Sequence, residues 1–182
     1  DRYQRVQQAI ASRRALECRY EAAVGSGKPD EDFRFEPYAL FFSVRAWYAI
    51  GRHAGRDDVR SLKLSRFSRI SPTDEAYEIP EGFSLEAHLG NAWRMIRGDE
   101  EHDVEIRFDA SFAQTVSDTM WHPTQRFEEH EDGSATFRCR VAGLDEIVWW
   151  ALGMGPHCEV IGPAALRERV RELASRTAGL YG

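Results

Sequence analysis

Basic and aromatic side chains alternate closely between residues 41 and 66 of this sequence. The segment includes the aromatic residues Phe41, Phe42, Trp47 and Tyr48, and basic residues that include Arg45, Arg52, Arg60, Lys63 and Arg66. An arginine guanidinium can bind a phosphate or a carboxylate through two parallel hydrogen bonds. An aromatic ring on a strand can stack on a nucleic-acid base, which contributes about 1–3 kcal/mol per base. These residue types therefore predict a site for nucleic acid or nucleotides.

The simpler interpretation is that the aromatic residues fill a core. It is the better interpretation for Phe41, and also for the neighbouring Leu40 and Ile50. Trp47 and Tyr48 are adjacent, so on a strand they point to opposite faces, one of which is open to a ligand.

The face of the sheet to which each basic side chain points depends on whether its strand is regular. On a regular strand Arg60 and Arg66 share one face, and Lys63 takes the other. A bulge or strong curvature changes this distribution.

Charge is unevenly distributed along the chain. The 182 residues contain 24 Lys and Arg and 30 Asp and Glu, which gives a net charge of -6. Residues 44–70 nevertheless contain seven basic and two acidic side chains, whereas residues 71–109 contain three basic and eleven acidic ones. Because exposed charges are screened beyond about 10 Å, a local basic face can persist on an acidic protein. The alternative is a solvated strand face without a ligand.

The sequence lacks the common catalytic and metal-binding patterns. Gly25-Ser26-Gly27-Lys28 lacks the spacing of a P-loop and is followed by Pro29, so we expect a flexible loop. The six histidines show no zinc spacing, and there is no nucleophile elbow. We therefore predict no metal, no cofactor and no enzymatic activity.

Composition and cysteine usage indicate a globular cytoplasmic protein. Hydrophobic residues make up 42% of the chain and charged residues 30%. No segment approaches the roughly 20 apolar residues of a membrane span. Cys18, Cys139 and Cys158 are widely spaced, which favours reduced, buried thiols over disulfides. A start without Met indicates a fragment of a longer chain.

The first half of the sequence predicts a helix followed by short strands. The apolar spacing predicts a helix at 2–13, a polar loop at 25–30, a turn at 51–58, and strands at 16–20, 33–36, 39–50 and 59–70, with Pro37 interrupting the second strand. Such a series of strands is typical of a small barrel or sandwich.

A connector and a helix are expected next. Residues 71–83 contain two prolines and one glycine and predict a connector. Ser84 is a suitable helix cap, and apolar residues at 85, 89, 93 and 96 predict one helical stripe that ends at Gly98. We place a domain boundary there, dividing the chain into residues 1–98 and 99–182.

The second half predicts the order strand, helix, strand, strand, helix, strand, followed by a last helix. Asp132-Gly133 marks a hairpin, Pro163 opens the last helix at its first turn, and Gly179 ends it. This order is typical of a ferredoxin-like fold. The predicted class is therefore α+β.

The first half resembles the WYL domain of bacterial transcription regulators. The resemblance rests on three stretches in order, namely Arg34-Phe35-Glu36-Pro37, Trp47-Tyr48-Ala49 and Arg60-Ser61-Leu62-Lys63-Leu64-Ser65-Arg66-Phe67. Ala49 replaces the leucine of the family name, and Arg69 adds a further basic residue.

The second half is similar to the WCX extension that follows WYL domains. The likeness rests on Asp132-Gly133, on residues 149–153, and on Val160-Ile161-Gly162-Pro163 followed by Leu166-Arg167. Together the two resemblances cover nearly the whole chain.

These resemblances imply a fold and a function. They imply an Sm-like, SH3-type small barrel, then a ferredoxin-like domain that mediates dimerisation. They also imply a promoter-binding winged helix-turn-helix that this sequence does not include, and a sensor for single-stranded DNA or a nucleotide-like effector. Carried over to this sequence, the expected ligand contacts are Tyr48, Arg60, Lys63 and Arg66, followed by Trp47 and Arg45.

Two other hypotheses remain open. In the first, the chain is an oligomerisation module without a small ligand, and the basic segment 44–70 pairs with the acidic segment 71–109. In the second, which ranks last, it is an enzyme acting on nucleic acid or nucleotides.

Overall fold

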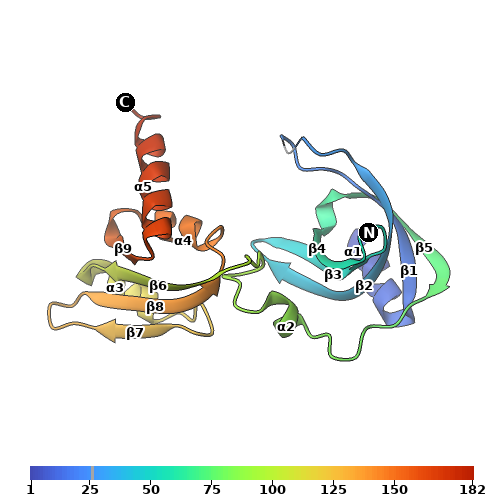
Figure 1. Ribbon diagram of the computed structural model, residues 1–182, viewed down its shortest axis with the longest axis horizontal. Helices are drawn as coiled ribbons and strands as arrows, with labels where there is room; N and C mark the ends of the chain where they lie inside the picture. Colours follow the sequence, from blue (N-terminus) through green and yellow to red (C-terminus); the bar gives the residue numbers. More distant parts are fainter. Residues whose placement is uncertain (26) are drawn as a thin grey trace. The chain divides into compact units, whose positions relative to one another are not determined.

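The computed structural model describes residues 1–25 and 27–182 and divides the chain into two units, Asp1–His88 and Leu89–Gly182 (Figure 1). Ser26, in the predicted loop 25–30, lies outside the described residues. The domain boundary that the sequence predicts between residues 98 and 99 stays a prediction. In the part of the chain that is described, no helix is long and apolar enough to cross a membrane.

The first unit contains one sheet of five antiparallel strands, strongly curved in Figure 1. Its sheet order is β4-β3-β2-β1-β5. The elements are α1 (Arg2–Ser12), β1 (Arg14–Tyr20), β2 (Glu31–Ser43), β3 (Ala46–His53), β4 (Asp58–Lys63), the 3₁₀ turn η1 (Leu64–Arg66) and β5 (Phe67–Ala76). Among the described residues no pairing joins β4 to β5, so closure into the predicted barrel is not shown.

Helix α1 packs on this sheet through one face. Its first turn is capped by the Asp1 carboxylate, which accepts a hydrogen bond from the backbone N–H of Tyr3 at 3.0 Å. Val6 and Ala9 are buried, as the predicted helix at 2–13 requires. They contact a core built from alternate residues of the strands, including Leu16, Cys18, Phe33, Phe35 and Phe67. Helix α1 therefore holds its N-terminal residues over the sheet.

The second strand continues through Pro37, contrary to the predicted interruption. Strand β2 spans 31–43, and its pairing with β3 shifts register between Pro37 and Ala39. A proline removes one N–H from a ladder, and a local register shift accommodates that loss. Strand β3 likewise continues to His53, so the turn that follows starts later than the predicted 51.

The predicted strand at 59–70 is in fact two strands joined by η1. Strand β4 ends at Lys63, and β5 begins at Phe67. Strand β5 also extends to Ala76, into the predicted connector, because it pairs with β1 as far as Arg14. The backbone turn at 64–66 removes the simple alternation of faces on which the prediction for Arg66 relied.

The predicted helix up to Gly98 is wrong. Helix α2 spans only Leu85–Leu89, with Ser84 Oγ accepting from the backbone N–H of Ala87 as expected for a cap. Trp93 is buried in the core of the second unit, and Ile96 is exposed. Gly98 does not end a helix but packs against another glycine of the second unit.

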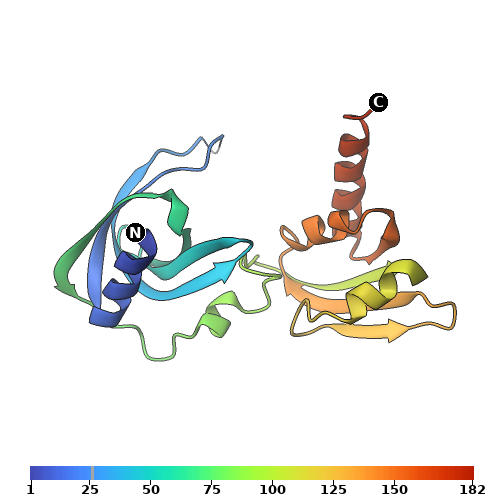
Figure 2. The ribbon, with the colours of Figure 1, turned by 180° about the vertical axis from the view of Figure 1, so that it is seen from behind.

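The second unit confirms the predicted order of strands and helices. Its elements are β6 (Glu101–Phe108), α3 (Ala110–Ser117), β7 (Arg126–Glu129), β8 (Ala135–Ala142), α4 (Ile147–Gly153), η2 (Gly155–His157), β9 (Cys158–Gly162) and α5 (Ala164–Ala178) (Figure 2). The four strands form an antiparallel sheet in the order β7-β8-β6-β9.

One core connects the sheet of the second unit with all three helices. Val116 of α3, Ile147 of α4 and Leu166 of α5 belong to the same buried cluster as Ile106 and Phe137. Asp132-Gly133 forms the predicted turn, in which Gly133 has a φ of 78°. Pro163 is the N-cap of α5 rather than its first helical residue, and Gly179 is the C-cap, as predicted.

Candidate ligand-binding pockets

The structure places five of the six predicted contact residues in two pockets of the first unit. One pocket contains Arg45, Trp47 and Lys63, and we call it the Trp47 pocket. The other contains Arg60 and Arg66, and we call it the Arg66 pocket. Tyr48 lines neither of them.

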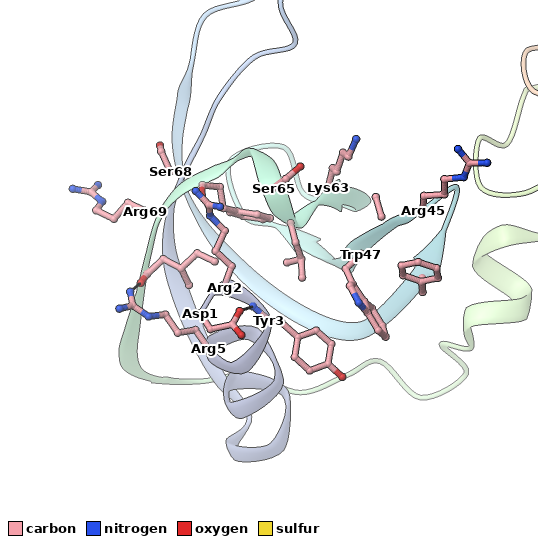
Figure 3. A pocket seen from close by; sticks show the side chains of 15 residues that line it. Asp1, Arg2, Tyr3, Arg5, Arg45, Trp47, Lys63, Ser65, Ser68 and Arg69 are labelled. Carbon is pink, nitrogen blue, oxygen red and sulfur yellow. Dashed lines mark hydrogen bonds between the residues drawn. The ribbon is translucent and has the colours of Figure 1, made fainter.

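The Trp47 pocket has a volume of about 890 Å³ and is shown in Figure 3. Helix α1, the β2–β3 hairpin and the segment from the end of β4 into β5 form its walls. The lining residues are Asp1, Arg2, Tyr3, Arg5, Phe42, Arg45, Ala46, Trp47, Lys63, Leu64, Ser65, Phe67, Ser68, Arg69 and Ile70. Residues 1–5 and residues 42–70 thus contribute to one cavity.

Three aromatic rings form an array along one side of the Trp47 pocket. The Trp47 ring meets Tyr3 edge-to-face, with 4.8 Å between the ring centroids, and meets Phe42 at 5.3 Å. Figure 3 shows the Tyr3 and Trp47 rings next to one another. Trp47 keeps 40% of its surface exposed and Phe42 keeps 56%. Because these rings are only partly covered by protein, they offer a surface on which a flat ligand can stack.

The hairpin that carries Phe42 and Trp47 has an unusual turn. Phe42 and Trp47 are cross-strand partners, and the turn between them contains Val44 and Arg45 with φ values of 47° and 60°. A β-branched residue such as Val44 rarely adopts a positive φ, and strained residues of this kind concentrate at ligand-binding sites. The turn places Arg45 at the edge of the pocket.

Five basic side chains and one carboxylate line the Trp47 pocket. Arg5 donates to the carbonyl of Ile70 at 2.7 Å, and Arg2 donates to the carbonyl of Phe67. Arg69 forms an ion pair with Asp32 at 2.9 Å, outside the pocket lining. Among the described residues, the structure gives the side chains of the other two, Arg45 and Lys63, no hydrogen bond or ion pair. These two cations are therefore available to an anionic ligand.

The Arg66 pocket has a volume of about 600 Å³ and is bounded by residues 20–22, residues 28–33 and strands β3 and β4. Its lining residues are Tyr20, Ala22, Lys28, Pro29, Asp30, Glu31, Phe33, His53, Arg56, Arg60, Ser61, Leu62 and Arg66. It shares no lining residue with the Trp47 pocket.

Arginines of the basic segment 44–70 are largely neutralised inside the first unit. Arg60 contacts Asp58 at 2.9 Å, and Arg56 contacts Glu31 at 3.0 Å. The hydrogen bond from Arg60 holds the pKa of Asp58 below its usual value, and the hydrogen bond from Arg56 does the same for the pKa of Glu31. Arg52 contacts both Asp57 and the buried Glu36. The excess of basic over acidic residues that is counted in the sequence of this segment therefore overstates its free positive charge.

Tyr48 stands apart from the other predicted contacts. It pairs with Lys63 across β3 and β4 and is half-buried. Among the residues that sequence reasoning did not assign to the site are Arg2, Tyr3 and Arg5 of helix α1. Their helix was predicted, but no signal in the sequence shows that the helix returns to the β2–β3 hairpin.

Burial affects the acidity of all three cysteine thiols. The three cysteines are unpaired, and burial raises the pKa of Cys18 and Cys139 to about 12 and that of Cys158 to about 11. Thiols with such a pKa are poor nucleophiles near neutral pH. In the described ranges 1–25 and 27–182, no group of His, Cys, Asp and Glu has the geometry of a metal site.

Two of the solved structures that match this chain align with most of its length. Proteasome accessory factor B/C (PafBC) of Arthrobacter aurescens matches 93% of this chain and 25% of its own length, with 18% identity and a TM-score of 0.41. A CRISPR Cas-related protein matches 99% of this chain and 51% of its own length, with 11% identity and a TM-score of 0.57. The second match supports the fold alone. The chain thus spans about a quarter of the length of the first protein and about half of the length of the second.

Two family models match the chain in the order that the sequence motifs predict. Residues 1–72 match the WYL domain, from α1 into strand β5, and residues 100–178 match the WCX domain, from β6 to the end of α5. Both pockets lie within the first match. The chain therefore belongs to the WYL-domain family, with a WYL domain followed by a WCX domain.

Proposed function

We propose that this chain is the effector-sensing region of a bacterial transcription regulator, and that the Trp47 pocket binds single-stranded DNA or a nucleotide-like effector. The observation that carries the proposal is one cavity of about 890 Å³ that combines a three-ring aromatic array with five basic side chains. Aromatic rings bind unstacked bases, and basic side chains bind the phosphates between them.

The arrangement of rings and cations in the Trp47 pocket favours single-stranded DNA over duplex DNA. In a duplex the base faces are already stacked on one another, so Trp47 and Phe42 would have no partner. A single strand can place a base against these rings while its phosphates reach Arg45 and Lys63. We therefore retain Arg45, Trp47 and Lys63 as contacts and add Tyr3 and Phe42. Tyr48, Arg60 and Arg66 are not part of this proposed site.

The proposal extends to the finer architecture. We assign the first unit to the Sm-like, SH3-type small barrels, supported by the β5-β1-β2-β3-β4 order and by the 3₁₀ turn between β4 and β5. We assign the second unit to the ferredoxin-like folds, supported by its βαββαβ order and its β7-β8-β6-β9 sheet. The functional division remains 1–98 and 99–182.

Control of transcription by the effector requires parts of the protein other than the ligand pocket. We propose that the WCX domain mediates homodimerisation and that a helix-turn-helix domain elsewhere in the full protein binds the promoter. The effector acts by binding two arrangements of the dimer with different affinities. Equal affinities would leave the equilibrium between the two arrangements unchanged. The role assigned to the chain is binding without catalysis. The unpaired cysteines support a cytoplasmic location.

Fluorescence anisotropy with labelled single-stranded DNA tests the proposal. We expect single-strand binding that weakens as salt rises, because bound phosphates release counterions. The double variant Arg45→Gln/Lys63→Gln should bind at least about tenfold more weakly. Its slope of log affinity against log salt should be smaller by about 1.4, for two lost phosphate contacts.

Two controls make this test specific. Arg176→Gln neutralises an exposed arginine of the second unit and should leave binding unchanged. Trp47→Ala should weaken binding without changing the salt slope, because stacking does not depend on counterions. Duplex DNA that binds as tightly as the single strand would contradict the stacking argument.

The oligomerisation hypothesis makes a different prediction. Among the described residues of the first unit, no ion pair joins a basic residue of 44–70 to an acidic residue of 71–88. That hypothesis requires the basic segment to pair with residues beyond these, in the same or in a neighbouring chain. Sedimentation at low and high salt, with wild type and Lys63→Glu, would reveal self-association that depends on the basic segment.

A further inference from the structure

A third cavity lies within the second unit and shares no lining residue with the Trp47 and Arg66 pockets. Its volume of about 380 Å³ falls in the range of small-molecule sites. Its walls are the end of β6, the start of α3, the turn between β7 and β8, and the segment from η2 into β9. We call it the His157 pocket. The backbone N–H of Asp109 donates to the carbonyl of His157 at 3.1 Å, which joins two of these walls.

The Arg107 guanidinium is oriented by the turn between β7 and β8. Its Nη2 atom lies 3.3 Å from Oδ2 of Asp132 and donates to Ser134 Oγ, also at 3.3 Å. Ser134 is buried, and its backbone N–H donates to Oδ1 of Asp132 at 2.9 Å. Among the described residues, no hydrogen bond or ion pair engages Nε or Nη1 of Arg107. The guanidinium therefore keeps donors for an anionic group.

Glu159 is the residue of β9 that lies directly opposite Arg107 in the antiparallel pairing with β6. Opposite residues of such a pair have Cβ atoms about 4.5–5.5 Å apart, which is near enough for an ion pair. Arg107 contacts Asp132 instead, and the structure gives the exposed Glu159 carboxylate no hydrogen bond or ion pair among the described residues. An unpaired carboxylate thus lies across the two strands from a guanidinium with free donors.

The His157 ring adds a second acceptor to this pocket. His157 Nδ1 lies 2.9 Å from Oδ2 of Asp109, whose other oxygen accepts from Ser111 Oγ at 2.6 Å. The hydrogen bonds from Ser111 and His157 hold the pKa of Asp109 below its usual value, so this carboxylate only accepts. Nδ1 therefore carries the proton, and Nε2 of the neutral ring is an acceptor without a partner among the described residues. The ring stacks parallel on Phe112, with 4.5 Å between centroids, which restricts its rotation.

The charges of the lining decide which net charge a ligand must have. The lining contains one guanidinium and three carboxylates, those of Asp109, Asp132 and Glu159. Hydrogen bonds within the turn between β7 and β8 hold the pKa of Asp132 below its usual value, so it is ionised at neutral pH. Negative charge exceeds positive charge whether or not His157 is protonated. A matching ligand therefore carries one anionic group and more than one cationic group.

We propose that the His157 pocket binds a free basic α-amino acid, with the chemistry of L-arginine. The α-carboxylate binds Arg107, and the α-ammonium binds Glu159 and Nε2 of His157. In an α-amino acid these two groups are attached to the same carbon, which suits side chains that lie opposite one another on neighbouring strands. The side-chain cation compensates the remaining carboxylates. The site lies within the WCX match and is independent of the proposed effector site.

Amide NMR spectra of the full chain, recorded during a titration with L-arginine hydrochloride, test this site. We expect saturable shifts of amides in the pocket walls, which sodium chloride at the same concentration does not cause. Glu159→Gln and Arg107→Gln should each weaken binding at least about tenfold, because each removes a charge-assisted hydrogen bond. Glu172→Gln and Arg176→Gln remove the same charges from exposed positions of α5 and should leave the affinity unchanged.

Three analogues of L-arginine test the parts of the ligand one at a time. Agmatine lacks the carboxylate, N-acetyl-L-arginine lacks the ammonium group, and L-citrulline lacks the charge of the side chain. Each should bind at least about tenfold more weakly than L-arginine. If Arg107→Gln fails to fold, as its own spectrum would show, Glu159→Gln and the three analogues carry the test.

Several outcomes would overturn the inference. They are absence of saturable shifts with L-arginine, shifts confined to amides of the first unit, unchanged affinity in both pocket variants, and equal affinity for L-arginine and its three analogues. Failure here leaves the single-stranded DNA test untouched, because that test uses different residues and a different ligand.

Discussion

At the scale of single residues, the position of a side chain relative to a turn decides whether it joins a site. Lys63 and Arg66 are three residues apart, yet η1 places them in different pockets. Arg60 has the residue type of a phosphate ligand, but Asp58 already holds its guanidinium. Residue type therefore identifies candidates, and only the neighbours decide which of them are free to bind.

Gly51 shows how a residue without a side chain can be essential to the sheet. A Cβ at this position would lie 2.1 Å from the carbonyl oxygen of Glu36 and 2.8 Å from Cα of Pro37. Both contacts are to the backbone of the neighbouring strand, at the register shift in β2. An alanine at residue 51 would have to displace that strand.

We expect Gly51→Ala to lower the free energy of unfolding by about 1–3 kcal/mol or more, the usual cost of overpacking. Urea denaturation followed by circular dichroism measures the change. Gly153→Ala is the matched control, because a Cβ there meets no atom within 4 Å. A Gly51→Ala variant as stable as Gly153→Ala would show that β2 moves aside without cost.

At the scale of elements, the segment after α2 is fixed by a single carboxylate. The Glu146 Oε2 atom accepts hydrogen bonds from three successive backbone N–H groups, those of Arg94, Met95 and Ile96, at 2.8–2.9 Å. This contact explains why residues 90–98 need no helix. The N–H donors of residues 94–96 are satisfied by a side chain rather than by carbonyls of a preceding turn.

We expect Glu146→Gln to destabilise the second unit by about 1–2 kcal/mol, because the hydrogen bonds lose their ionic acceptor. Hydrogen exchange of the amides at 94–96 should become faster, which NMR or mass spectrometry detects. Glu131→Gln, at an exposed turn, removes the same charge and should leave these amides protected. Unchanged exchange in Glu146→Gln would mean that other contacts hold the segment.

At the scale of the whole molecule, each unit has its own core. The buried cluster around Trp93, Phe137 and Trp150 contains only residues of the second unit. The clusters around Phe35 and around Tyr38 contain only residues of the first. A core that closes within one unit is the physical basis of independent folding.

We therefore expect residues 89–182, produced alone, to fold with one cooperative thermal transition, and residues 1–88 to do the same. Circular dichroism and the dispersion of NMR amide signals test this for each fragment. A fragment of 99–182, which lacks Trp93, should be less stable than 89–182, because a buried tryptophan costs about 3–5 kcal/mol when removed. A disordered 89–182 fragment would contradict this interpretation of the cores.

The sequence by itself determined the local features of this protein. Helix α1, the Asp132-Gly133 turn, the βαββαβ order of the second half and the cap at Ser84 follow from periodicity and from turn chemistry, which act over a few residues. The resemblance of both halves to known domains also rests on motifs of a few consecutive residues each. Trp47, Arg45 and Lys63 were also candidates from residue type alone.

The tertiary structure decided everything that depends on distant residues. It ended α2 at Leu89 because Trp93 is buried in the second core. It brought Tyr3 to Trp47, across more than forty residues of sequence, and separated Lys63 from Arg66 by one 3₁₀ turn. It also neutralised Arg60 through Asp58. Burial, register and ion pairing are properties of the packed chain, so a pattern read along the sequence cannot contain them.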